Sequence, residues 1–124
     1  MTEPCPCGRG KAFEACCGRY TGTVVPAPDA EALMRSRYTA FVRGDVAHLL
    51  ATWHAGTRPA SLELDAALKW LGLEVKRHKP IDAAHAEVEF VARSRIQGRG
   101  QRLHERSRFV REDGRWFYVD GDVT

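Results

Sequence analysis

The sequence contains no apolar run that approaches the ~18 residues of a membrane-spanning helix. It also has no charged start followed by an apolar core, the pattern of a secretory signal. We therefore expect a cytoplasmic protein without a membrane span. An excess of one charge is missing too, because 19 Lys and Arg against 16 Asp and Glu give a formal net charge of only +3. Dedicated nucleic-acid-binding domains concentrate far more positive charge.

The motifs of common enzyme classes are also absent. The sequence has no Ser-His-Asp order, no H-E-x-x-H zinc motif and no nucleophile elbow. The stretch Gly8 to Lys11 resembles a short phosphate-binding loop, but it lacks the G-x-x-x-x-G-K-[ST] spacing and a preceding strand. We assign no catalytic residue and expect a binding protein rather than an enzyme.

Cysteine is scarce, and all four cysteines lie within thirteen residues with the spacing C-x-C-x8-C-C: Cys5, Cys7, Cys16 and Cys17. Four thiolates form the ligand set of a closed tetrahedral zinc site. Disulfides are the main alternative, but the adjacent Cys16 and Cys17 could pair with each other only under strain, and a reducing compartment disfavours them. An iron–sulfur cluster or free, redox-active thiols are further alternatives. The spacing predicts one structural Zn²⁺.

The residues between the cysteines suit a metal-binding turn. Gly8 and Gly10 permit positive φ angles, which let backbone N–H groups point at the sulfurs. A zinc ion with four thiolates carries a charge of −2. The neighbouring Arg9, Lys11 and Arg19 would offset that charge.

The cysteine-rich segment is followed by residues that break regular structure, including Gly22, Pro26 and Pro28. We place a boundary near residue 23, with a metal-binding segment at 1–22 and a second domain at 23–124.

Three helices are predicted after this boundary. Asp29 caps a helix that runs through Arg43, and Asp45 caps a second one from Val46 to about His54. Ser61 opens a third, short helix that ends at Gly72 and whose apolar face carries Leu64, Leu68 and Leu71.

From Leu73 the pattern alternates, which predicts four strands: Leu73–Lys79, Ala86–Ile96, Arg102–Glu112 and Arg115–Asp120. Asp113-Gly114 between two such runs is a strong signal for a two-residue type I′ hairpin. Helices followed by antiparallel strands indicate an α+β fold, with a bent sheet against helices.

The cysteine-rich stretch Cys-Pro-Cys-Gly-Arg-Gly-Lys-Ala-Phe-Glu-Ala-Cys-Cys-Gly resembles the SEC-C motif, a zinc knuckle also found at the C-terminus of the preprotein translocase motor. The resemblance implies that Cys5, Cys7, Cys16 and Cys17 bind the zinc ion, with Cys17 where the motif often has His. In the translocase motor the knuckle contacts an export chaperone and the ribosome. By this resemblance we expect a protein-interaction or adaptor module whose knuckle binds a protein partner.

Four further stretches carry a resemblance: Ala-Leu-Met-Arg-Ser-Arg-Tyr at 32–38, Leu-Ala-Thr-Trp-His at 50–54, Trp-Leu-Gly-Leu at 70–73 and Leu-His-Glu-Arg-Ser-Arg-Phe at 103–109. With them the chain resembles the bacterial YchJ-like family and its cone-shaped nuclear transport factor 2-like fold. This fold implies three helices packed on a curved antiparallel sheet.

The resembled fold encloses a pocket between sheet and helices, which some members use for catalysis and others for binding or dimerisation. The pocket candidates in this sequence are Tyr38, Trp53, His54, His104, Glu105 and Ser107, with Arg35, Trp70 and Arg108 as further polar or aromatic candidates. Glu105 and Ser107 share a strand face with Leu103 and Phe109. An inward Glu105 needs a partner, since burying a lone carboxylate is costly. Either Arg35 or Arg37 could supply a structural ion pair, and a ligand or acid–base role is the alternative.

The positions of the histidines and tryptophans can be explained by structural roles, without a role in catalysis. His54 lies at a predicted helix end, where the helix dipole favours a cation. His48, His78 and His85 are expected at the surface, and the three tryptophans in the core.

Arginines gather on the predicted strands and their loops: Arg93, Arg95, Arg99, Arg102, Arg106, Arg108, Arg111 and Arg115. One outward face of this kind could bind the phosphates of RNA or the ribosome. Interleaved glutamates, among them Glu87, Glu89 and Glu105, favour cross-strand ion pairs instead.

Three functions therefore remain open from the sequence. The first is a zinc-dependent adaptor, the second is small-molecule binding or catalysis in the pocket, and the third is RNA or ribosome binding through the arginine face. A homodimer is a further expectation, since an exposed edge strand favours pairing.

Overall fold

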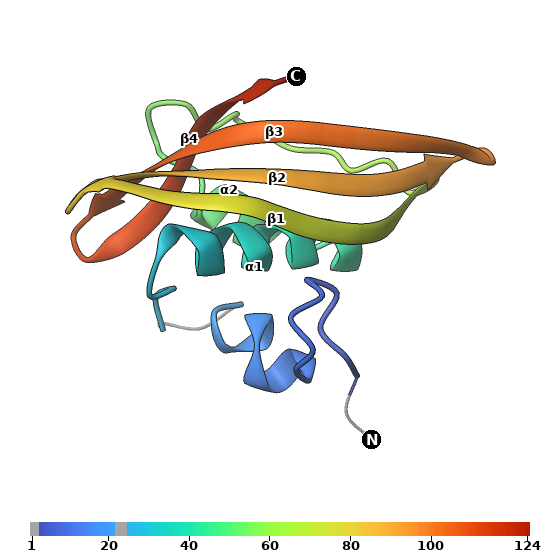
Figure 1. Cartoon of the computed structure of the whole chain (residues 1–124), viewed down its shortest axis with the longest axis horizontal. Helices are drawn as coiled ribbons and strands as arrows, with labels where there is room; N and C mark the ends of the chain where they lie inside the picture. The colour runs from blue at the N-terminus through green and yellow to red at the C-terminus, as the bar shows by residue number, and fades with distance from the viewer. Residues whose placement is uncertain (1–2, 22–24) are drawn as a thin grey trace.

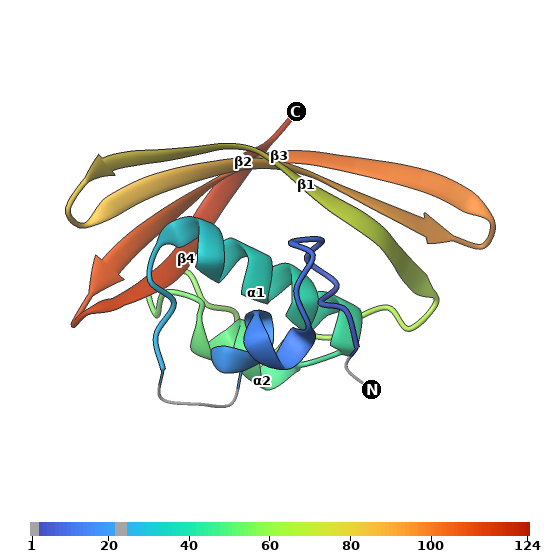
Figure 2. The same cartoon turned by 60° about the horizontal axis from the view of Figure 1, so that its bottom comes forward.

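The computed structural model describes residues 3–21 and 25–124, so the boundary expected near residue 23 lies outside the described residues. A curved four-stranded sheet arches over the longest helix, and the cysteine-rich segment lies on the side of that helix that faces away from the sheet (Figures 1 and 2). The predicted α+β class is confirmed. No helix within 3–21 and 25–124 is long and apolar enough to cross a membrane.

The helices are α1 (Ala30–Arg43), α2 (Val46–Ala51) and two short 3₁₀-helices, η1 (Phe13–Ala15) and η2 (Cys17–Arg19). Helix α1 begins where the Asp29 carboxylate accepts a hydrogen bond of 2.7 Å from the Ala32 N–H. It ends at Gly44, which has a φ of 73°. An N-cap carboxylate and a left-handed glycine are the start and stop signals that the sequence predicted.

The strands are β1 (Leu68–Asp82), β2 (His85–Ile96), β3 (Arg99–Glu112) and β4 (Arg115–Val123). They pair antiparallel in chain order, β1-β2-β3-β4. The β3–β4 turn has φ angles of 52° at Asp113 and 76° at Gly114, as a type I′ turn requires. Gln97 and Gly98 make an equally tight turn between β2 and β3, with φ angles of 50° and 79°. These tight turns fix the register of the sheet.

The predicted third helix is wrong. Residues 61–65 have no regular secondary structure, and Leu68 already belongs to β1. Trp70 pairs with Ser94 of β2, and its side chain turns inward, while Leu71 is 56 % exposed. The long strand β2 offers backbone hydrogen bonds as far as Ile96, and these extend β1 into a leucine-rich segment whose spacing also fits a helix.

Helix α2 is shorter than predicted, because the chain leaves the helix at Thr52 and joins the sheet. Trp53 forms an isolated bridge with Tyr118 of β4, and the His54 N–H donates a 2.8 Å hydrogen bond to the Tyr118 carbonyl. His54 is therefore not at a helix end, and the helix-dipole explanation for it does not apply.

The core lies between α1 and the concave face of the sheet. Leu33, Met34 and Tyr38 of α1 meet Val88 and Phe109 of the sheet, each of them 6 % exposed or less. The sheet extends beyond the helix layer, and the space between sheet and helix is only partly filled by these side chains.

Candidate metal centre and pocket

The structure brings the four cysteines together beside α1, where Phe13 and the β1 residue Leu73 pack against the cluster. Their Sγ atoms all lie within 4.8 Å of one another, and the Sγ atoms of Cys7 and Cys16 are 3.6 Å apart. A tetrahedral zinc ion with Zn–S bonds of about 2.3 Å needs sulfurs about 3.8 Å apart. None of the four is in a disulfide. All are nearly inaccessible to solvent, and together they could bind a metal ion.

The chain reaches this arrangement through two tight turns. Gly8 and Gly10 have φ angles of 80° and 86°, as the sequence predicted for residues that turn the backbone toward the sulfurs. Helices η1 and η2 then place Cys16 and Cys17 opposite the first pair. Gly18 is required by close packing, since a Cβ atom there would lie 2.7 Å from the Phe13 carbonyl oxygen.

The proximity of the thiols changes their acidity. A hydrogen bond from the Cys17 thiol lowers the pKa of Cys7 to about 4, against the opposing effect of burial, and the Arg9 backbone N–H also donates to this sulfur. The same hydrogen bond raises the pKa of Cys17, because Cys17 acts as its donor. Burial raises the pKa of Cys16. A bound cation would favour deprotonation of all four thiols.

Helix α1 contacts the cysteine cluster directly. The Thr39 hydroxyl oxygen lies 3.7 Å from the Cys5 Sγ, and Arg35 Nη1 donates a 2.9 Å hydrogen bond to the Cys7 carbonyl. The guanidinium of Arg43 covers the Phe13 ring at 4.0 Å from its centroid. The cysteine-rich segment is therefore packed against α1 and does not project from the fold.

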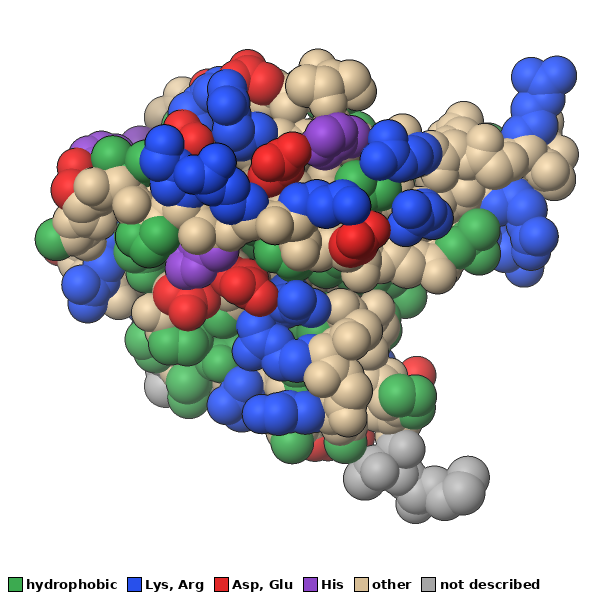
Figure 3. All heavy atoms as spheres, in the orientation of Figure 1, with side chains coloured by type: hydrophobic (Ala, Val, Ile, Leu, Met, Phe, Trp, Pro, Cys, Tyr) green, Lys and Arg blue, Asp and Glu red, His purple; other side chains and the backbone are tan. Residues whose placement is uncertain are grey.

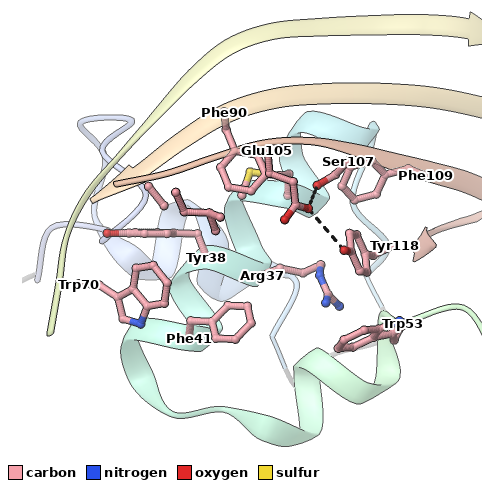
Figure 4. Close-up of a pocket in the computed structure, with 13 residues that line it drawn as sticks. Arg37, Tyr38, Phe41, Trp53, Trp70, Phe90, Glu105, Ser107, Phe109 and Tyr118 are labelled. Atoms are coloured by element: carbon pink, nitrogen blue, oxygen red, sulfur yellow. Dashed lines mark hydrogen bonds between the residues drawn. The ribbon is translucent and has the colours of Figure 1, made fainter. Parts of the chain in front are cut away.

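The opposite side of α1 forms one wall of a pocket of about 150 Å³ beneath the sheet (Figure 4). Its lining is mainly aromatic: Tyr38, Phe41, Trp70, Phe90, Phe109 and Tyr118, with Trp53 at one end. Tyr38 and Trp70 meet edge to face with ring centroids 5.7 Å apart, and Phe109 and Tyr118 do so at 5.8 Å. These rings form a rigid apolar enclosure.

Polar groups enter the pocket from β3 and β4. Glu105 Oε2 accepts a short hydrogen bond from the Ser107 hydroxyl and a longer one, 3.4 Å, from the Tyr118 hydroxyl. The nearby carboxylate contributes to a Tyr118 pKa of about 12, second to burial. The predicted partners of Glu105 were Arg35 and Arg37. Among the described residues neither forms an ion pair with it, because Arg35 is paired with Glu31 on the other side of α1 at 2.9 Å.

Arg37 is the cation of the pocket and is only 5 % exposed. Its Nη1 donates hydrogen bonds to the Leu49 carbonyl at 2.8 Å and to the Thr52 hydroxyl at 2.7 Å. Its guanidinium carbon lies 4.6 Å from the Tyr118 ring centroid and 5.0 Å from that of Trp53. Burial lowers the pKa of Arg37 to about 10, so the side chain stays cationic at neutral pH.

The structure places four of the six pocket candidates, namely Tyr38, Trp53, Glu105 and Ser107, in the pocket lining. His54 and His104 are elsewhere. His54 Nε2 lies 2.9 Å from a carboxylate oxygen of the exposed Glu112, and His104 Nε2 lies 2.6 Å from Glu89 on the outer face of the sheet.

Sequence reasoning did not select Tyr118, although it lies in a strand where alternate residues turn inward. The register from the Asp113-Gly114 turn is regular as far as Tyr118, which pairs with the inward Phe109, so alternation with Trp116 is the signal that could have identified it. His48 was expected at the surface but is only 7 % exposed, with Nε2 3.0 Å from the Ser36 hydroxyl.

Three arginines on the outer face of the sheet, Arg93, Arg106 and Arg108, form ion pairs with acids. Arg108 forms ion pairs with Asp120 at 2.6 Å and Asp122 at 2.8 Å, and these carboxylates raise its pKa. Arg106 lies 3.6 Å from Asp122 and 4.0 Å from Glu87. Figure 3 shows blue and red side chains interspersed over this face. The mixture of signs reduces its attraction for a phosphate backbone.

Two family models match this chain. Residues 1–19 match the SEC-C motif, and residues 29–121 match the family described as YchJ, middle NTF2-like domain. The UPF0225 protein of Polaromonas naphthalenivorans is 62 % identical, with 98 % of each chain covered. The UPF0225 protein of Methylibium petroleiphilum is 64 % identical over 97 % of this chain and 88 % of its own.

Two solved structures have the same fold. The solution structure of a SEC-C motif containing protein from Rhodopseudomonas palustris has a TM-score of 0.87 and 32 % identity, and the match covers 98 % of this chain and 99 % of that one. The crystal structure of a SEC-C motif containing protein from Psychrobacter arcticus has a TM-score of 0.81 and 28 % identity, covering 98 % and 83 %.

Proposed function

This chain belongs to the YchJ family of proteins with a SEC-C motif and an NTF2-like domain, and from that premise we propose that its cysteines hold one structural Zn²⁺ in a knuckle that binds a protein partner. Four sulfurs around one ion leave no open coordination position, so the metal would organise the chain and would not act on a substrate. The observation that supports this role is the burial of all four sulfurs within 4.8 Å of one another.

The knuckle is suited to binding because its outer side is exposed while its base is fixed. Arg9, Lys11 and Arg19 are exposed there, and the same short segment carries two exposed acids, Glu3 and Glu14. Figure 3 shows Lys and Arg side chains gathered over α1 and the cysteine-rich segment. Contacts with α1 hold this basic surface in one geometry, which lowers the entropy lost on binding. An acidic protein surface is the complementary partner.

Metal content tests the first half of the proposal. We expect one zinc ion per chain in protein purified without added chelator, measured by inductively coupled plasma mass spectrometry, and a loss of that zinc in Cys16→Ser. Iron in place of zinc, or a chain that contains no metal, would contradict it.

Charge reversal tests the adaptor role without disturbing the metal. Arg9→Glu combined with Lys11→Glu should keep the zinc content but lose the protein partners retained from a bacterial lysate, as identified by mass spectrometry. The matched control is Arg77→Glu with Lys79→Glu, two exposed cations of β1. If the knuckle variant retains the same proteins as the control, the knuckle is not the binding surface.

A further inference from the structure

The pocket contains a hydrogen-bond acceptor that the described residues do not use. Glu105 receives both of its hydrogen bonds, from Ser107 and Tyr118, at the same oxygen, Oε2. Figure 4 shows the other carboxylate oxygen turned away from these two donors and toward the interior of the pocket. No hydrogen bond to Oε1 is found within 3–21 and 25–124. Glu105 is only partly buried, so Oε1 is free to accept a hydrogen bond from a molecule in the pocket.

The nearest donors of α1 are engaged elsewhere, whereas Trp53 Nε1 at one end of the pocket is buried without a hydrogen-bond partner among the described residues. The Tyr38 hydroxyl interacts with the Gly72 backbone, and Figure 4 shows it at the far end of the ring from Glu105. Arg37 donates through Nη1 to helix α2 and stacks on the rings of Trp53 and Tyr118. The open acceptor is therefore available to a bound molecule.

The size of the pocket and its walls limit what that molecule can be. A cavity of about 150 Å³ lined by hydrocarbon accommodates a molecule of about benzene size. Rings on several sides favour a flat aromatic ligand that packs edge to face. Glu105 disfavours an anion and the buried Arg37 disfavours a cation, so a neutral ligand fits the charges best.

We propose that the pocket binds a small neutral aromatic molecule with one hydrogen-bond donor, and that Glu105 Oε1 accepts the hydrogen bond from it. The phenol class has this chemistry, with a six-membered ring for the aromatic walls and one hydroxyl for the carboxylate. Glu105 thus determines specificity, and Ser107 and Tyr118 hold its carboxylate in position.

The test compares phenol with toluene, which has nearly the same shape and no donor. Full-length, zinc-loaded protein is titrated with each probe and followed by ¹H–¹⁵N NMR. We expect phenol to bind at least tenfold more tightly, because phenol gains a hydrogen bond to the Glu105 carboxylate that toluene cannot make. In Glu105→Leu the preference should fall to about one. The matched control Glu89→Leu changes a glutamate on the outer face of the sheet and should keep the preference.

A measurement on the protein without substitutions tests the proposal even if Glu105→Leu does not fold. The ¹³C signal of the Glu105 carboxyl carbon should shift when phenol is added and stay in place with toluene. Equal binding of the two probes, no binding of either, persistence of the preference in a folded Glu105→Leu variant, or spectral changes confined to residues outside the pocket would each overturn the proposal.

Discussion

The hydroxyl oxygen of Thr39 lies 3.7 Å from the Sγ of Cys5, a contact between helix α1 and a candidate metal ligand. Thr39 is 1 % exposed, so this contact is shielded from water. A hydroxyl hydrogen bond to a metal-bound thiolate fixes its orientation and tunes the affinity for the metal.

Replacement of Thr39 by Val should therefore weaken zinc binding while the shape of the side chain is kept. We expect a loss of ten- to a hundredfold in affinity, typical of outer-shell partners of metal ligands. Competition with a chromophoric chelator measures it. The control is Thr21→Val, since the Thr21 hydroxyl donates to the backbone carbonyl of Cys17 and not to a sulfur. An equal loss in both variants would show that the Thr39 contact is not specific.

Arg37 stabilises the junction of α1, α2 and the sheet. In Arg37→Met the Leu49 carbonyl and the Thr52 hydroxyl lose their donor, and both stacked rings lose the guanidinium. We expect a decrease of about 2 kcal/mol in the free energy of unfolding, measured by urea denaturation of the zinc-loaded protein. Arg111→Met, at an exposed position of β3, should change it by less than about 0.5 kcal/mol. Equal values for the two would contradict this role.

His48 should make the fold less stable in mild acid. Burial lowers its pKa from the ordinary value of 6.5, with Arg37 also lowering it and Asp45 opposing. Because the Ser36 hydroxyl donates to the Leu33 carbonyl, the neutral imidazole donates to Ser36 through Nε2–H. Below pH 6.5 the unfolded chain takes up a proton that the folded chain resists, so stability is full above 6.5 and falls as the pH drops.

The variant His48→Gln isolates this effect, because glutamine can donate the same hydrogen bond without titrating. The loss of unfolding free energy between pH 7.5 and pH 5.5 should be smaller in His48→Gln than in the parent chain. The cysteine thiols contribute equally to both. Identical pH profiles would show that His48 is protonated equally well in the folded state.

The sequence predicts most of the helices and strands because their ends carry local signals. Asp29, Gly44 and Asp113-Gly114 act through their own backbone geometry or side chain, and the structure places each as predicted. The prediction for the segment around Trp70 failed because the spacing of its leucines fits a helix or a strand equally well. Only the length of β2, which lies elsewhere in the chain, decides between them.

The inward orientation of the Trp70 side chain allows a test of whether this segment is a strand or a helix. Trp70 contacts the rings of Tyr38 and Phe41 with centroid distances of 5.7 Å each, whereas Leu71 is 56 % exposed. Trp70→Ala should cost about 2 kcal/mol or more of unfolding free energy, and Leu71→Ser less than about 0.5 kcal/mol. A helix with Leu64, Leu68 and Leu71 on its buried face would give a large loss for Leu71→Ser instead.

The cysteine cluster and the pocket also differ in how far the sequence predicts them. The cysteine cluster is contained in one short segment, so the spacing of its cysteines was enough to predict that the four sulfurs lie together. The pocket is assembled from α1, β1, β2, β3 and β4, and its polar end needs Tyr118 of β4 beside Glu105 of β3. Contacts of this kind come from the pairing and packing of several elements, which the residue spacing within one segment does not show.

Helix α1 connects the two sites, and removal of the metal should therefore affect the pocket. Thr39 and Arg35 face the cysteine-rich segment, while Arg37 and Tyr38 of the same turns line the pocket. Without the ion, four clustered thiols lose the attraction that holds them, and α1 loses the surface packed against it. Hydrogen exchange of the α1 amides should become faster in chelated protein, and its affinity for phenol should fall severalfold. Restoration of both by added zinc would establish the coupling, because an irreversibly unfolded chain would not recover. If exchange in α1 becomes faster while phenol binding stays unchanged, the metal stabilises the helix but the pocket does not depend on the metal.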